Sequence, residues 1–163
     1  MLHKIVILGN SGSGKSTLAK KLAEKEKLAH LDLDTLAWLP TSPPKRQLID
    51  VSRHDIEQFM SENDAWVIEG CYSDLLDIAL PQATELIFLN LPLDECIANA
   101  QRRPWEPHKY SSKQAQDENL SMLIEWIKQY YEREDTFSYQ SHKHLFDSFK
   151  GPKKMIEQNQ ERS

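Results

Sequence analysis

The segment Gly9–Ser16 is the most constraining feature of this sequence, because GNSGSGKS matches the pattern G-x-x-x-x-G-K-[ST] without exception. Glycines let the backbone turn tightly and approach a ligand, and successive N–H groups then form an anion-binding nest at a helix start. In this pattern the lysine reaches nucleotide phosphates and the next hydroxyl binds Mg²⁺. We therefore expect a P-loop that binds ATP and Mg²⁺, made of Gly9, Asn10, Ser11, Gly12, Ser13, Gly14, Lys15, Ser16 and Thr17.

The flanking residues favour a P-loop over a chance match in a glycine-rich turn. Lys4 to Leu8 is a short apolar run, rich in β-branched residues, that is typical of a buried strand. Residues 15–27 are rich in Ala, Leu, Lys and Glu, which favours a helix. A strand before and a helix after the motif is the context that a P-loop requires. We therefore assign Lys15 to the phosphates and Ser16 to the metal.

Apolar runs and helical patterns alternate along the rest of the chain. Helices are expected around residues 56–60, between Pro92 and Pro104, and along 120–131, where apolar residues recur at helical spacing. Further strands are expected at 29–33, 65–68, 85–89 and, as the candidate fifth strand, 144–146. This alternation predicts an α/β fold, with a parallel sheet covered by helices on both faces.

Acidic residues follow two of the expected strands. Asp32 and Asp34 alternate at the end of the second strand, and Glu69 stands before Gly70 at the end of the third. The carboxyl ends of strands line the ligand crevice in open α/β sheets. Asp32 or Asp34 could take a proton from an acceptor hydroxyl or hold a Mg²⁺-bound water, and Glu69 could support Mg²⁺. The alternative interpretation is that these carboxylates are solvated residues at strand ends.

Three arginines are candidates for neutralising charge during phosphoryl transfer. Arg102 and Arg103 end a helix beside a proline-rich turn, where plain capping of the helix dipole is the alternative. Arg133 follows Trp126 and Tyr130 at helical spacing, so the three are expected to share a face. With Lys15, Asp32 and Asp34, these arginines complete the candidate catalytic set.

Composition excludes some functions. The net charge of −5 argues against a protein whose main task is to grip nucleic acid. No apolar run approaches the ~18 residues that a membrane span needs, and the N-terminus lacks a signal-peptide pattern. Cys71 and Cys96 have no CxxC spacing and are read as free thiols. We expect a cytoplasmic protein that is a monomer or a homodimer, with a small-molecule partner.

These motifs resemble the small P-loop kinases related to adenylate and shikimate kinases. Within that group the chain looks most like the uncharacterised "topology modulation" (FlaR-like) branch, through HLDLD at residues 30–34 and WVIEGCYS at 66–73. The resemblance implies a three-layer P-loop fold with five parallel strands in the order 2-3-1-4-5, Mg·ATP as donor and a mobile lid. We expect one domain over residues 1–163, with an acceptor-side insertion at 35–62 and a lid at 102–118.

The departures from these relatives leave the acceptor open. Shikimate kinases have a glycine cluster after the third strand, and adenylate kinases have Asp-Gly-Phe-Pro-Arg, whereas this chain has Gly70-Cys71-Tyr72. The favoured function is transfer of the γ-phosphoryl group of ATP to a small hydroxyl- or phosphate-bearing acceptor. The alternative is a regulatory or nucleic-acid-associated ATP-binding protein. A GTP-dependent switch is disfavoured, because N-K-x-D and D-x-x-G elements are absent.

Overall fold

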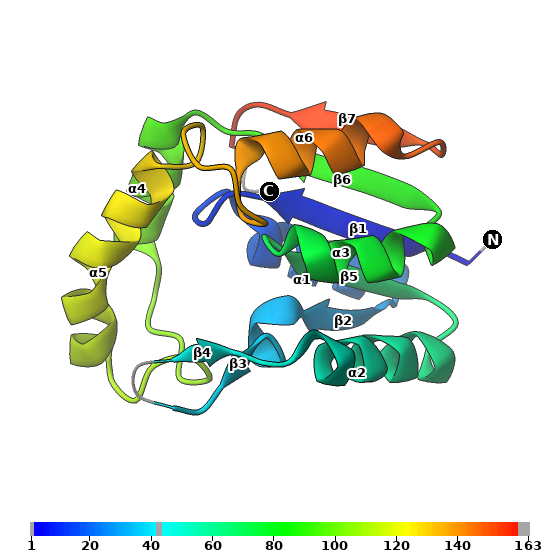
Figure 1. Ribbon diagram of the computed structural model, residues 1–163, viewed down its shortest axis with the longest axis horizontal. Helices are drawn as coiled ribbons and strands as arrows, with labels where there is room; N and C mark the ends of the chain where they lie inside the picture. The colour runs from blue at the N-terminus through cyan, green and yellow to red at the C-terminus, as the bar shows by residue number, and fades with distance from the viewer. Residues whose placement is uncertain (1, 42–43, 160–163) are drawn as a thin grey trace.

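The computed structural model describes residues 2–41 and 44–159, in which five strands form one parallel sheet (Figure 1). The sheet order is β2-β5-β1-β6-β7. Numbered along this sheet alone, that is the order 2-3-1-4-5, so the expected α/β P-loop topology is confirmed. The strands are β1 (Lys4–Gly9), β2 (Ala29–Asp32), β5 (Trp66–Gly70), β6 (Glu85–Leu89) and β7 (Lys153–Ile156).

The three inner strands are almost entirely buried, which explains their continuous apolar runs. Successive side chains of β1 alternate between two cores. Val6 and Leu8 belong to one apolar cluster, and Ile5 and Ile7 belong to another. Because both faces of the sheet are covered, the polar residues that remain near these strands gather at the carboxyl ends.

Helices form a layer on each face of this sheet (Figure 1). Helix α1 (Lys15–Glu26) packs on one face through Ala19, and three helices pack on the other. Those three are α2 (Ile49–Glu62), α3 (Ser73–Ala79) and α6 (Tyr139–Ser148). Short 3-10 turns, η1 (Leu33–Thr35) and η2 (Leu80–Gln82), follow β2 and α3.

Two further helices lie beyond the carboxyl ends of the strands, at the left of Figure 1. They are α4 (Leu93–Arg102) and α5 (Lys113–Lys128), which pack together around Cys96, Ala100 and Ile127. The start of α4 after Pro92 and its end before Pro104 match the sequence prediction. Residues 103–112 connect the two helices and form the segment that we call the lid loop.

The prediction of a fifth strand at residues 144–146 was wrong. These residues lie inside α6, because His142 and Leu145 bury one side of a helix against the sheet. Gly151 and Pro152 follow that helix, and the edge strand β7 comes after them. The Lys153 ammonium donates to the carbonyls of Phe146 and Phe149, so the first residue of β7 also closes the end of α6.

Residues 35–62, expected as an insertion, form a hairpin and a helix. The antiparallel strands are β3 (Trp38–Leu39) and β4 (Lys45–Arg46), and α2 follows them. Residues 40–44, which include three prolines, separate these strands, and residues 42–43 lie outside the described part. The Ser52 hydroxyl, within α2, donates to the Leu36 carbonyl and ties this helix to the turn before the hairpin. Among the described helices, none is long and apolar enough to cross a membrane.

Candidate functional site

The loop between β1 and α1 has the backbone geometry that its glycines predict. Gly9, Gly12 and Gly14 have φ angles of 157°, 79° and 88°, which side chains other than hydrogen rarely allow. A Cβ atom on Gly12 would lie 2.3 Å from the Cys96 carbonyl oxygen of α4. By contrast, a Cβ on Gly14 would meet nothing within 4 Å. The loop therefore packs closely against α4 at Gly12 and is open at Gly14.

Polar groups in this loop point to an anion. The Lys15 ammonium donates to the Asn10 carbonyl at 2.8 Å, which folds the side chain across the loop. The buried Ser13 hydroxyl has no hydrogen-bond partner among the described residues. Unsatisfied buried donors are costly, and a phosphate oxygen would satisfy this one. Asn10 faces the other way, since its side-chain amide donates to the Ile127 carbonyl of α5 at 3.2 Å.

Ser16 and Glu69 lie together at the base of the loop. The Ser16 hydroxyl donates to Glu69 Oε2 at 2.7 Å, and His30 Nε2 lies 2.9 Å from the same oxygen. Glu69 is only 2% exposed, so a charged carboxylate here requires such partners. Hydroxyl and carboxylate oxygens are the ligands that Mg²⁺ prefers, so these two residues fit the ion. No cluster of three or more His, Cys, Asp or Glu capable of holding a metal occurs in the described ranges.

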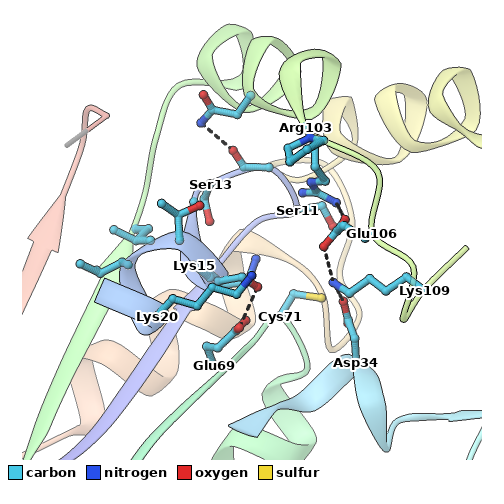
Figure 2. A pocket seen from close by; sticks show the side chains of 18 of the residues that line it. Ser11, Ser13, Lys15, Lys20, Asp34, Glu69, Cys71, Arg103, Glu106 and Lys109 are labelled. Atoms are coloured by element: carbon cyan, nitrogen blue, oxygen red, sulfur yellow. Dashed lines mark hydrogen bonds and ion pairs between the residues drawn. The ribbon is translucent and has the colours of Figure 1, made fainter. Parts of the chain in front are cut away.

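A cavity of about 590 Å³ opens in front of the loop. Its size is within the usual range for small-molecule and cofactor sites. The P-loop and α1 form its floor, Asp34 of η1 and the end of β5 form one side, and the lid loop covers another (Figure 2). The cavity-lining residues include Ser11, Gly12, Ser13, Gly14, Lys15, Ser16, Thr17, Asp34, Glu69, Arg102, Arg103 and Lys109.

Asp34 lines the cavity and both of its carboxylate oxygens have partners. The Tyr72 hydroxyl donates to Oδ1, and the Lys109 ammonium donates to Oδ2 at 2.7 Å. Burial, the largest single effect, would raise the pKa of Asp34, but the charges of Lys109 and Lys15 and the hydrogen bonds from Lys109 and Tyr72 together lower that pKa. Tyr72 itself remains protonated, since burial raises the pKa of its hydroxyl. Asp34 is therefore a charged, oriented carboxylate at the edge of the cavity.

Asp32 differs from Asp34 in its surroundings. Its side chain accepts a hydrogen bond from the Asp34 backbone N–H at 2.9 Å and closes the turn after β2. Burial raises the pKa of Asp32, and the neighbouring charge of Glu69, its partner in the sheet register, adds to the effect. Asp32 does not line the cavity. Of the two aspartates, Asp34 is the better placed to meet a ligand.

The structure separates the three candidate arginines. Arg102 donates to the Asn99 side chain at 3.1 Å, and Arg103 donates to Glu106 at 3.3 Å, both at the cavity. Arg133 is absent from the cavity lining. Its guanidinium lies 3.4 Å from the ring centroid of Trp126 and pairs with Asp135 at 2.8 Å. The prediction that Trp126, Tyr130 and Arg133 share a helical face was wrong, because α5 ends at Lys128; Arg133 contacts Trp126 from beyond the helix and does not line the cavity.

Sequence reasoning missed three residues at this site. Lys109, whose ammonium reaches Asp34, is not among the candidates predicted from the sequence. His30 and Tyr72 were seen only as parts of longer motifs. The available signal was their position next to strand ends, where parallel strands gather side chains. Cys71 also lines the cavity, but burial raises the pKa of its thiol to about 12, so it is not a nucleophile.

Comparison with known proteins agrees with this geometry. A family model described as an AAA domain matches residues 5–124, which is most of the chain. The chain belongs to this AAA domain family. The uncharacterized protein YqaC of Bacillus subtilis (strain 168) is 26% identical over 132 residues, which span 80% of this chain and 74% of that protein.

Among solved structures, this AAA domain protein is similar to a shikimate kinase from Bacteroides thetaiotaomicron. The identity is 15% and the TM-score is 0.49, with 90% of this chain and 98% of that chain covered. The fold is defined by the protein's own strand order. The P-loop, its cavity and its carboxylates together form the candidate nucleotide-binding site.

Proposed function

We propose that this protein is a phosphotransferase that moves the γ-phosphoryl group of Mg·ATP to a small acceptor. The observation that carries the proposal is the joining of two elements in one cavity. The P-loop lies on one side, and Asp34, a charged and oriented carboxylate, lies on another. Phosphoryl transfer needs both an anion cradle and a group that accepts the acceptor's proton.

In the proposed reaction, the N–H groups of the P-loop and Lys15 bind the β- and γ-phosphates of ATP. An acceptor oxygen attacks the γ-phosphorus while the bond from that phosphorus to the β–γ bridging oxygen breaks. The acceptor's hydroxyl proton passes to Asp34, and ADP leaves with the bridging oxygen. Where the acceptor is itself a phosphate, its oxygen is already ionised and Asp34 acts by position alone.

Ser16 and Glu69 would hold Mg²⁺, with Glu69 acting directly or through a water. The ion would neutralise charge on the phosphate oxygens when bound. His30, which contacts the same Glu69 oxygen, orients this carboxylate in the protein itself. Thr17 lines the cavity next to Ser16 and supplies a second hydroxyl near the phosphates.

In this proposal the acceptor side is formed by the β3–β4 hairpin within residues 35–62. The Trp38 indole donates to the Tyr72 hydroxyl at 2.8 Å, so the hairpin is connected to Asp34 through Tyr72. Trp38 is 40% exposed, and the Arg46 guanidinium lies 5.0 Å from the Tyr72 ring centroid. A small acceptor that enters here would reach Asp34 from the side opposite to the P-loop.

We propose that the protein works in the cytoplasm, since its cysteines Cys71 and Cys96 are free thiols.

The test is nucleotide consumption by the protein with Mg·ATP and a panel of acceptors. The panel contains nucleosides, nucleoside monophosphates, sugars and hydroxy acids, and Lys15→Ala is the blank. Stimulation by one class, lost in Lys15→Ala and in Asp34→Asn, supports the proposal. Stimulation that survives in Lys15→Ala contradicts it. Binding of ATP without stimulation by any acceptor favours the regulatory alternative, which salt-dependent retention on DNA would then test.

A further inference from the structure

The basic groups around the cavity differ in where they point. Lys15 is folded onto the Asn10 carbonyl within the P-loop, and Arg102 bonds to Asn99 on its own helix. Arg103 pairs with Glu106 within the lid loop. Lys109 alone among these four extends from the lid loop to the end of β2, where it binds Asp34.

Three carboxylates from two segments surround the Lys109 ammonium, and Figure 2 shows two of them, Asp34 and Glu106. Its nitrogen lies 2.7 Å from Asp34 Oδ2, 3.4 Å from Asp32 Oδ2 and 3.6 Å from Glu106 Oε2. The side chain is only 19% exposed, although it belongs to a connecting loop. Despite its burial, these carboxylates raise the pKa of Lys109, so the group stays charged at neutral pH. A fixed positive charge therefore stands where the nucleotide cavity meets the acceptor side.

We propose that Lys109 is a catalytic residue, the lid group whose ammonium contacts the phosphoryl group during its transfer. This inference rests on the proposed function. A migrating phosphoryl group lies between the donor in the P-loop and the acceptor beside Asp34, and it carries negative charge on its oxygens. The ammonium at Asp34 is already next to that position. A cation placed in advance costs no reorganisation when the charge develops.

The Asp34 contact also links closure of the lid to the chemistry. While Lys109 donates to Oδ2 and Tyr72 donates to Oδ1, each oxygen of Asp34 already accepts one hydrogen bond, which makes the carboxylate a weaker base toward an acceptor. Transfer of the ammonium from Asp34 to the incoming phosphate oxygens frees Oδ2 to take the acceptor's proton. The same movement keeps the lid loop over the cavity, because the ammonium exchanges one anionic partner for another.

The experiment compares binding of Mg·ADP alone with binding of Mg·ADP plus aluminium fluoride, a mimic of the migrating phosphoryl group. Calorimetry measures both affinities for the wild type, Lys109→Met, Lys109→Arg and Lys113→Met. Lys113, the first residue of α5 directly after the lid loop, is a matched control, since its pair with Asp117 is exposed. In Lys109→Met we expect an unchanged Mg·ADP affinity and a complex with aluminium fluoride at least about tenfold weaker. Lys109→Arg should keep most of the gain in affinity that aluminium fluoride gives the wild type, and Lys113→Met should keep all of it.

Other outcomes overturn the proposal in distinguishable ways. If aluminium fluoride raises the affinity of Lys109→Met as much as that of the wild type, Lys109 does not contact the phosphoryl group. The kinase proposal then stays intact. Equal weakening of both complexes in Lys109→Met makes Lys109 a lid anchor and not a catalytic residue. If aluminium fluoride fails to tighten the wild-type complex, or Lys15→Ala binds like the wild type, the phosphotransferase proposal fails and the role of Lys109 fails with it.

Discussion

The Ser16 hydroxyl donates a hydrogen bond to Glu69 Oε2 across 2.7 Å, although 53 positions separate the two residues. Ser16 lies in the first turn of α1, and Glu69 lies near the end of β5, which pairs with β1. The pairing of β5 with β1 therefore places Glu69 beside the P-loop. The two residues could be matched to one metal from their motifs, and the fold supplies the contact between them.

Glu69→Gln should weaken the Mg²⁺ dependence of ATP binding. The substitution keeps the size of the side chain but removes the charge that Ser16 and His30 contact. We expect the Mg²⁺ concentration for half-maximal ATP binding to rise by roughly 10- to 100-fold, as for other supporting carboxylates. A Mg²⁺ titration monitored by calorimetry measures it. Glu125→Gln, an exposed carboxylate on α5, is the control, and an unchanged midpoint in Glu69→Gln would remove Glu69 from the metal site.

Gly12→Ala should destabilise the fold more than Gly14→Ala. Both glycines have positive φ angles, so both substitutions carry backbone strain of about 1 kcal/mol or more. Only the Cβ at position 12 would clash, at 2.3 Å from the Cys96 carbonyl oxygen, which adds about 1–3 kcal/mol. Urea unfolding of the two variants measures the difference in free energy. Equal losses of stability would contradict the close packing of the P-loop on α4.

Protonation of His142 should destabilise the protein in acid. His142 is buried, the Tyr130 hydroxyl lies 2.6 Å from its Nδ1, and its Nε2 lies 2.7 Å from the Cys71 carbonyl oxygen. Burial lowers the pKa of His142 from 6.5 to about 4. The unfolded chain thus takes the proton first, and stability is lost as the pH falls from 6.5 to about 4.

The size of this effect is on the order of 3 kcal/mol when the whole window has been crossed. It is measured as the free energy of unfolding against pH for the wild type and for His142→Gln. The difference between the two curves removes the contribution of Asp32, whose raised pKa acts in the opposite direction. Parallel curves between pH 4 and 6.5 would show that His142 is not held neutral in the fold.

Arg133→Met should lower stability while leaving nucleotide binding unchanged. The guanidinium stacks on Trp126 and pairs with Asp135, and it does not line the cavity. Loss of the stack and the pair should cost about 1–2 kcal/mol in thermal or urea unfolding. The affinity for Mg·ATP, measured on the same samples, should stay within about twofold of the wild type. A large loss of affinity would restore Arg133 to the catalytic set.

Much of the fold follows from the sequence, since its signals are local. Gly9–Ser16 requires a strand before it and a helix after it, and the apolar runs of β1, β5 and β6 are continuous because those strands are buried on both faces. The edge strand β7 escaped detection because KKMI at residues 153–156 is half polar. His144 to Phe146 looked like a strand because the partners that bury α6 lie far away in the sequence.

The site was predictable where one motif contains it and not where segments meet. The P-loop residues were named from their spacing, and Glu69 and Asp34 from their places after strands. Lys109 could not be ranked above the other basic residues from the sequence. Its contact with Asp34 depends on the path of the loop that connects α4 to α5. Arg133 looked equivalent to Arg102 in sequence, and only its packing on Trp126 distinguishes it.

The most direct test of the central claim is the transfer of label from γ-labelled ATP to the small-molecule fraction of a cell extract. The protein is incubated with Mg²⁺, the labelled ATP and that fraction, and the products are separated. The account predicts a new labelled compound that forms with the wild type and is missing with Lys15→Ala and Asp34→Asn. Label that passes only to inorganic phosphate, at equal rates in the wild type and Asp34→Asn, would contradict it.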